Sequence, residues 1–212
     1  MVRKTKAEAA ETRHHILDAA EQMFLAQGVA RTSLQQVAEA AGVTRGAVYW
    51  HFKDKADLFS AMMDRVTMPC EAAMTEALAR PSEEALAGMA AMAMTPLREL
   101  ATQAQVQRVF SIAMHYTEYT EELAPVRQRH HESVTSFVEQ LQTMLGRAGQ
   151  HLRPGLDTRS AALGLFALVD GLMRHWTLAP ESFNLVAVGE QSIHSYLAGL
   201  QMAGPQKVLA NR

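Results

Sequence analysis

The fold is decided by residues 32–52, which read TSLQQVAEAAGVTRGAVYWHF. Ser33 and Gln36 have the spacing of a capping box, in which two side chains satisfy free amides at the start of a helix. The apolar residues that follow recur at helical spacing as far as Gly42, a residue type that often ends helices. This part of the stretch therefore predicts one short helix.

A second short helix is predicted directly after the first. Thr44 can cap its start, and Val48 and Phe52 lie one turn apart on the same side. Two short helices separated by Gly42-Val43-Thr44 predict a helix-turn-helix. This motif places its later helix in the major groove of DNA.

The outer face of the second helix has side chains that suit contact with DNA. If the two apolar residues point inward, Arg45 and Gly46 fall on the outer side, and Tyr49 and Trp50 share that side one turn later. Arg45 can make paired hydrogen bonds to a guanine edge, and Gly46 allows the backbone to approach closely. Tyr49 can donate its hydroxyl to a phosphate, and Trp50 can contact a thymine methyl group.

Polar side chains that flank the motif extend the predicted contact surface. Three hydroxyl groups, and a lysine at the start of the next helix, are placed to hold phosphates on either side. A basic arm of Arg3, Lys4 and Lys6 adds nonspecific attraction. The predicted DNA contacts are Thr32, Ser33, Thr44, Arg45, Gly46, Ala47, Tyr49, Trp50, His51 and Lys55.

The same spacing also fits a second class of protein. Short helices joined by a glycine turn occur in many helical bundles, so a small-ligand-binding or scaffold module without DNA binding is the alternative. An exposed Tyr49-Trp50 pair beside Arg45 and Lys55 favours a binding surface, because exposed aromatic side chains without a partner lower solubility. Binding to upstream DNA separates the two interpretations.

The rest of the chain is also dominated by helical periodicity, so the predicted fold class is all-α. A helix is predicted over residues 11–27, and another begins at Lys55, with Pro69 as a kink or interruption. Five more are predicted over residues 83–103, 105–115, 121–148, 157–178 and 184–202. The pattern separates a three-helix head, residues 1–55, from a helical body, residues 56–212.

Composition and charge are those of an ordinary globular chain. Of 212 residues, 48% are hydrophobic and 20% charged, and the net charge of −2 by itself argues neither for nor against nucleic acid. Residues 1–55 carry a net charge of +2 and the remainder −4, which makes the head mildly basic. The sequence has neither the roughly 20 apolar residues of a membrane span nor a signal peptide. We therefore expect a cytoplasmic protein with no membrane partner.

The sequence contains no recognisable catalytic or metal-binding motif. Cys70 is the only cysteine, which excludes an intrachain disulfide and a cysteine zinc cluster. His14-His15 and His130-His131 are adjacent pairs, whose side chains point about 100° apart on a helix and cannot easily share a metal ion. No nucleophile elbow, phosphate loop or dinucleotide fingerprint occurs. We therefore expect neither an enzyme nor a bound cofactor.

Several short runs in the chain are shared with one known family. In the first 60 residues they are Arg3 to Lys6, Glu11 to Arg13, Ile16 to Ala20, Gly28-Val29, Thr32 to Leu34, Ala41 to Gly46, Tyr49 to Phe52 and Lys55. On these residues the chain resembles the TetR family of bacterial repressors, and within it the AcrR-like regulators of multidrug efflux operons. Beyond residue 60 the landmarks are His115, Glu118, Tyr119, Val169 to Leu172, Trp176 and Pro180. Tyr116-Thr117 stands where close relatives carry a Lys-Cys pair.

The resemblance implies a homodimer that reads a palindromic operator in double-stranded DNA. Residues 1–55 would be the DNA-binding domain, and residues 56–212 a domain for dimerisation and for a small hydrophobic or cationic effector. The last two long helices would form a four-helix bundle with those of the partner. A regulator of another metabolic or stress operon is the alternative within the family.

The resemblance also implies which helices surround the effector. Methionine side chains can repack around ligands of different shape, although a methionine at helical spacing is also ordinary core packing. Glu118 and Asp170 could pair with cationic drugs, and Asp170 is notable because it lies in an apolar run. The implied effector contacts are Met89, Met92, Phe110, Met114, Glu118, Phe166, Asp170 and Met173.

Overall fold

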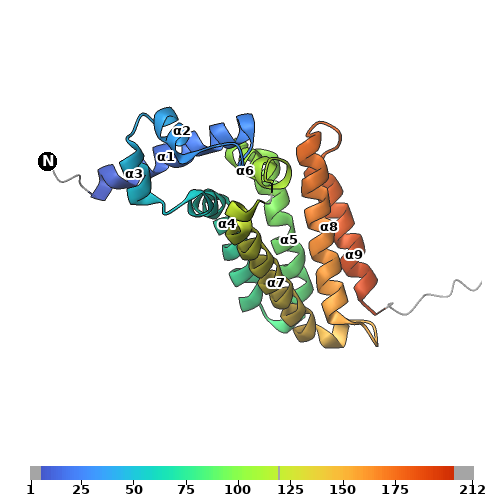
Figure 1. Cartoon of the computed structure of the whole chain (residues 1–212). Coiled ribbons are helices and arrows are strands. Elements are labelled where there is room, and N and C mark those ends of the chain that lie inside the picture. Colours follow the sequence, from blue (N-terminus) through green and yellow to red (C-terminus); the bar gives the residue numbers. More distant parts are fainter. Residues whose placement is uncertain (1–5, 119, 203–212) are drawn as a thin grey trace, which may run out of the picture. The chain divides into compact units, whose positions relative to one another are not determined.

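The computed structural model describes residues 6–118 and 120–202, which form helices joined by short turns (Figure 1). The only β pairing in this part of the chain is an isolated bridge between Leu152 and Gln201. The all-α prediction is therefore confirmed. The α-helices are α1 (Lys6–Gln27), α2 (Leu34–Ala40), α3 (Arg45–His51), α4 (Lys55–Ala79), α5 (Ala85–Thr102), α6 (Ala104–His115), α7 (Ala124–Arg147), α8 (Thr158–Leu178) and α9 (Leu185–Leu200). Short 3-10 turns are η1 (Ser82–Glu84), η2 (Glu121–Leu123) and η3 (Gly149–His151).

The chain divides into two compact units, each built from two segments. Unit 1 comprises Met1–Met68 and Thr102–Ser133, and unit 2 comprises Pro69–Ala101 and Val134–Arg212. This division differs from the one predicted at residue 55, because α6 packs on α1 and so belongs with the head. The functional division at residue 55, with DNA binding before it and effector binding after it, stays a prediction.

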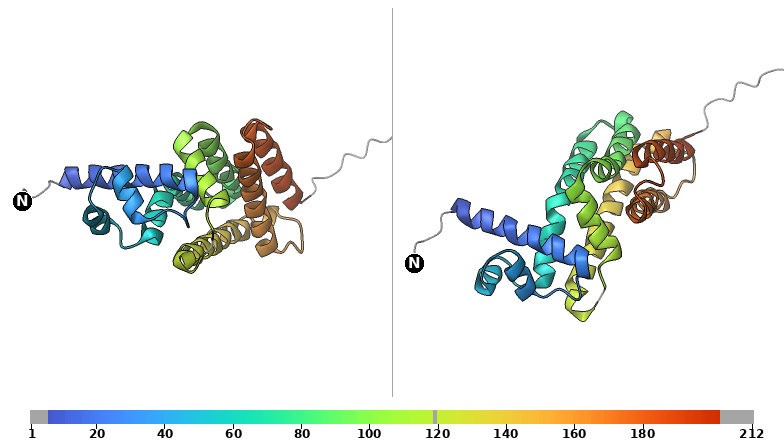
Figure 2. Two further views of the ribbon diagram at one scale, coloured as in Figure 1. Left: turned by 45° about the horizontal axis from the view of Figure 1, so that its top comes forward. Right: turned by 90° about the horizontal axis from the view of Figure 1, so that it is seen from above.

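Unit 1 is organised around α1, which packs against both α2 and α6. Figure 2 shows α1 as a straight rod with α2 and α3 beside it. Ile16, Leu17 and Phe24 on α1 are fully buried, and the Phe24 ring lies 6.3 Å from that of Phe59 on α4. This core fixes α1 to the first turns of α4.

Local capping signals place the helix starts where they were predicted. Ser33 and Gln36 form the full capping box of α2. At the start of α4, the Asp54 side chain accepts a hydrogen bond from the Asp57 amide at 2.8 Å. Helix α1 begins five residues earlier than the predicted start at residue 11, because the Ala- and Glu-rich residues before it favour the helical state.

The two internal prolines do not end their helices. Pro69 lies inside α4 and Pro96 inside α5, and both helices continue past them. Each proline removes one backbone hydrogen bond. Buried residues on both sides of each proline hold the helix in place by packing. On α4 these include Val66 in unit 1 and Met74 in unit 2. Of the two outcomes predicted for Pro69, the interruption is therefore wrong, and the kink stays a prediction.

In unit 2, α8 and α9 run side by side (Figure 1). Gly164 on α8 allows this close packing, because a Cβ atom there would collide with Tyr196 on α9. Gly189 on α9 allows an equally close approach to α5, where a Cβ atom would collide with Leu97. The Tyr196 hydroxyl uses the space at Gly164 to donate to the Ala161 carbonyl at 2.8 Å. Helices α8 and α9 therefore form a tight pair.

None of the described helices is both long and apolar enough to span a membrane.

Candidate DNA-binding surface

The turn between α2 and α3 sets the direction of α3. Gly42 has a φ of 65°, the left-handed conformation that L-residues with side chains rarely adopt. Its amide donates to the Glu39 carbonyl at 3.1 Å, and the Val43 amide donates to the Ala38 carbonyl at 2.9 Å. These two bonds form a Schellman motif, which ends α2 and turns the chain into α3.

The inner face of α3 is anchored by the two predicted apolar residues. Val48 is fully buried and Phe52 is 2% exposed. The Arg13 guanidinium of α1 lies over the Phe52 ring, 5.1 Å from its centroid. Since both residues point into unit 1, the opposite side of α3 must face outward, as predicted.

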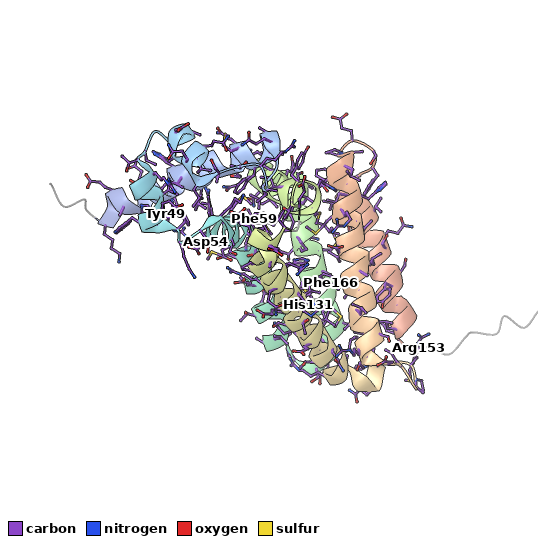
Figure 3. The ribbon with its side chains drawn as sticks, in the orientation of Figure 1. Tyr49, Asp54, Phe59, His131, Arg153 and Phe166 are labelled. Atoms are coloured by element: carbon purple, nitrogen blue, oxygen red, sulfur yellow. The ribbon has the colours of Figure 1, made fainter. Side chains whose placement is uncertain are left out.

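The outer face of α3 carries a basic group and two large aromatic groups. Tyr49 is 47% exposed and Trp50 is 72% exposed. Arg45 lies beside Tyr49: its Nη2 donates to the Tyr49 hydroxyl at 3.3 Å, and its guanidinium lies 5.3 Å from the ring centroid. Figure 3 labels Tyr49 on this helix. The contact holds the guanidinium along the helix surface.

Gly46 on the same face has no structural reason to be a glycine. A Cβ atom there would meet only Thr44 Oγ1, at 3.9 Å, which is an ordinary contact. Glycine near the start of a helix lowers its stability relative to alanine. The missing side chain instead leaves the surface open next to Arg45, where another molecule's backbone or base edge can approach.

Two of the predicted phosphate contacts are turned inward. Thr32 is 1% exposed, and its hydroxyl donates to the Gly28 carbonyl at 2.8 Å. Lys55 is 5% exposed, and its ammonium donates to the Ala30 and Thr32 carbonyls, both at 3.0 Å. Neither group is offered to solvent, because each satisfies backbone carbonyls inside unit 1. We therefore do not retain Thr32 and Lys55 as phosphate contacts.

The other predicted DNA contacts lie at or near the surface. Ser33 and Thr44 are exposed, and their hydroxyl oxygens accept the capping hydrogen bonds of α2 and α3. Ala47 is partly exposed, and the His51 ring packs edge-on against Trp50 at 4.5 Å. The arm residues Arg3 and Lys4, and the family landmark Tyr119, lie outside the described residues.

A buried carboxylate between α1 and α6 was not predicted from the sequence. Glu21 is 2% exposed, and its Oε1 has no hydrogen-bond partner among the described residues. Gln105 donates to Oε2 at 3.3 Å, and Arg108 Nε lies 3.6 Å from Oε1. Burial raises the pKa of Glu21 above its ordinary value of 4.5, although Gln105 and Arg108 oppose the shift.

The raised pKa of Glu21 leads to a prediction for stability. The folded state favours the protonated form of Glu21, whereas the unfolded chain ionises at its ordinary pKa of 4.5. The free energy of unfolding therefore falls as pH rises from 4.5 through the raised pKa of the folded state. We expect Glu21→Gln to increase the free energy of unfolding by about 1 kcal/mol near pH 7. The gain should be largely lost at about pH 4, where the acid is mostly protonated in both folded and unfolded states. Urea unfolding at the two pH values measures this difference.

The control for Glu21→Gln is Glu11→Gln, which removes the same charge from an exposed position on the same helix. It should change the free energy of unfolding by less than about 0.5 kcal/mol at either pH. A gain for Glu21→Gln that is equal at both pH values would contradict the pKa argument.

The predicted effector contacts are distributed over both units. In unit 2, Met89, Met92 and Met173 are buried, and Phe166 packs edge-on against Phe137 with ring centroids 6.0 Å apart (Figure 3 labels Phe166). In unit 1, the predicted contacts are Phe110, Met114 and Glu118, of which Glu118 is exposed. These residues remain predictions.

Asp170 does not lie in an enclosed apolar site. Its side chain is 35% exposed, and its carboxylate lies 3.8 Å from Arg174 Nε, one turn along α8. A shallow depression of about 470 Å³ in unit 2 is lined by the loop from Arg153 to Asp157 and by Tyr196, and contains none of the predicted contacts. We therefore do not assign the recognition of a cationic drug to Asp170.

A capped helix-turn-helix with an open, basic and aromatic outer face, in an all-helical chain, defines a DNA-binding transcriptional regulator. Comparison with known proteins identifies its family. Residues 16–62 match the family described as bacterial regulatory proteins, tetR family. Residues 84–202 match the C-terminal region of MAATS-type transcriptional repressors. The chain belongs to the TetR family.

Three relatives illustrate the similarity. The chain is 38% identical over 210 residues to the HTH-type transcriptional regulator TtgR of Pseudomonas putida, covering 96% of this chain and 98% of TtgR. It superimposes with a TM-score of 0.86 and 36% identity on NalD, the secondary repressor of the MexAB-OprM multidrug efflux pump in Pseudomonas aeruginosa, covering 94% and 100% of the two chains. The TM-score is 0.81, with 29% identity and coverage of 92% and 93%, for SmeT of Stenotrophomonas maltophilia bound to triclosan. The resemblance to regulators of multidrug efflux is confirmed.

Proposed function

We propose that the protein represses a multidrug efflux operon by binding a palindromic operator as a homodimer, and that a hydrophobic or cationic drug releases it. The observation that carries DNA recognition is the outer face of α3. Arg45, Tyr49 and Trp50 project there, while Val48 and Phe52 hold the helix from behind. The guanidinium supplies guanine recognition, and the aromatic groups supply phosphate and thymine contacts.

Dimerisation through α8 and α9 is supported by exposed apolar side chains on α8. Leu163 is 54% exposed and Leu178 is 66% exposed, at the two ends of that helix. Small residues between them, Ala167 and Gly171, are also exposed and permit close approach of a second helix. A two-fold dimer would use the same face on both protomers.

We expect Leu163→Glu to weaken the dimer at least about tenfold, because it brings two buried charges together across the two-fold interface. Analytical ultracentrifugation over a dilution series measures the dissociation constant. Met68→Glu is the control, since Met68 is 66% exposed on α4. A dimer that is unaffected by Leu163→Glu would exclude this face of α8.

Effector binding is proposed for the apolar interior of unit 2. Met89, Met92 and Met173 bring flexible thioethers into this interior, and Phe166 adds an aromatic ring. Such side chains can repack around ligands of different shape. An effector that binds best to the DNA-free conformation weakens operator binding. By thermodynamic linkage, DNA weakens effector binding by the same factor.

The test is a mobility shift with the intergenic DNA upstream of the gene for this chain. The proposal expects a specific shift that triclosan reverses, since triclosan is the ligand bound to the related SmeT. No specific shift would favour a helical ligand-binding module without DNA binding. A specific shift next to an operon of another metabolic or stress function would retain the repressor and reject efflux control.

A further inference from the structure

The buried ammonium of Lys55 joins two segments that are distant in the sequence. Besides the Ala30 and Thr32 carbonyls, it contacts Glu122 Oε2 at 2.8 Å. An ammonium has three donors, and these three oxygens occupy all of them. Ala30 and Thr32 belong to the turn between α1 and α2, whereas Glu122 belongs to the connection between α6 and α7.

A second contact holds the same turn to the same connection. The Val29 amide donates to the Tyr116 carbonyl at 3.0 Å. Gly28, the residue before Val29, has a φ of 85°, a backbone conformation that residues with a side chain rarely adopt. The connection from Tyr116 to Glu122 therefore contacts the turn at both of its ends.

The charge of Glu122 matters for this contact. A buried cation is costly unless an anion and hydrogen bonds compensate it, and the carboxylate that contacts Lys55 is that of Glu122. Glu122 itself is 58% exposed, so its replacement opens no cavity in the core. Its loss would leave Lys55 bonded to neutral carbonyls alone, which weakens the hold on the turn.

The position of this turn determines the position of the DNA-reading helix. The turn leads directly into Ser33, the cap of α2, and the Schellman motif at Gly42 fixes α3 to the end of α2. A turn that moves relative to α1 therefore carries both short helices with it.

We propose that Glu122 is a positioning residue for operator binding: through Lys55 it fixes the turn between α1 and α2, and thereby the helix-turn-helix, in the DNA-binding position. This inference rests on the proposed repressor function. It assigns Lys55 to the interior of the head rather than to a DNA phosphate.

The test compares Glu122→Ala with Glu121→Ala in the full-length protein. Both variants lose one carboxylate at neighbouring exposed positions of η2, so their general effect on DNA attraction is the same. Glu122→Gln is a graded variant that keeps one acceptor oxygen without the charge. Amide exchange at Val29 and Thr32 reports on the turn, and the affinity for the upstream duplex, measured over a range of salt concentrations, reports on DNA binding.

We expect Glu122→Ala to speed exchange of both amides by roughly 3- to 30-fold relative to Glu121→Ala, and to weaken duplex binding by a similar factor. Glu122→Gln should lie between the two. The dependence of affinity on salt should be unchanged, because no phosphate contact is lost. If Glu122 contributed only to general stability, its replacement would lower the melting temperature without speeding exchange at these two amides in particular.

Three results would overturn the inference. Equal exchange and affinity in both alanine variants would make Glu122 an ordinary surface residue. Faster exchange without weaker binding would show that the turn does not control the affinity. If Glu122→Ala binds DNA more tightly and with a steeper salt dependence, Lys55 contacts a phosphate once the ion pair with Glu122 is removed. If the wild-type protein does not bind the duplex, the proposed repressor function fails, and the exchange data still decide whether Glu122 holds the turn.

Discussion

Replacing Lys55 by methionine should lower the free energy of unfolding by about 2 to 4 kcal/mol. Methionine has a similar length and keeps most of the apolar contacts of the stem, but it supplies no donor. The Ala30 and Thr32 carbonyls would then lose the ammonium to which each is bonded at 3.0 Å. Leaving a buried acceptor without its donor costs about 1 to 3 kcal/mol, and here two acceptors are affected.

Urea unfolding at a fixed protein concentration measures this effect, because the stability of a dimer depends on concentration. Lys53→Met is the matched control: Lys53 is exposed two residues earlier, and its loss should cost less than about 0.5 kcal/mol. Equal free energies of unfolding for the two variants would show that the Lys55 contacts do not stabilise the folded protein. A stable Lys55→Met protein with weaker, less salt-dependent DNA binding would restore Lys55 as a phosphate contact.

The features that could be predicted from the sequence are those set by near neighbours. The capping box of Ser33 and Gln36 spans three residues, and the caps at Thr44 and Asp54 span the same distance. The inward and outward faces of α3 follow from the helical period once Val48 and Phe52 are recognised as core residues. The predicted helices in the rest of the chain rest on the same periodicity, and their bounds match within a few residues.

The features that could not be predicted depend on contacts between distant segments. Lys55 sits at a position typical of a phosphate contact, and nothing adjacent to it reveals that Glu122 will lie 2.8 Å from its ammonium. Glu21 lies on α1 like any charged residue of an amphipathic helix, until α6 covers it with Gln105 and Arg108. Pro69 predicts a break from local rules alone, whereas packing on both sides keeps α4 continuous.

Replacing Arg45 by alanine should weaken operator binding by about 1 to 3 kcal/mol for each half-site. A bidentate contact from arginine to guanine discriminates between bases, so the loss should be concentrated at one base pair per half-site. The structure favours this role because the Tyr49 hydroxyl and ring hold the guanidinium along the outer face of α3. Less side-chain freedom is then lost when the contact with DNA forms.

Fluorescence anisotropy with the wild-type operator, and with duplexes substituted at each base pair, measures both the affinity and its sequence dependence. Lys53→Ala removes the same charge from an exposed site in the head, and any loss it causes should be equal for all duplexes. The affinity of Arg45→Ala should instead be unchanged by substitutions at the base pair that Arg45 contacts. If its base preferences match those of the wild type, while its affinity falls equally on all duplexes, Arg45 contacts phosphate and the reading of guanine must be assigned elsewhere on α3.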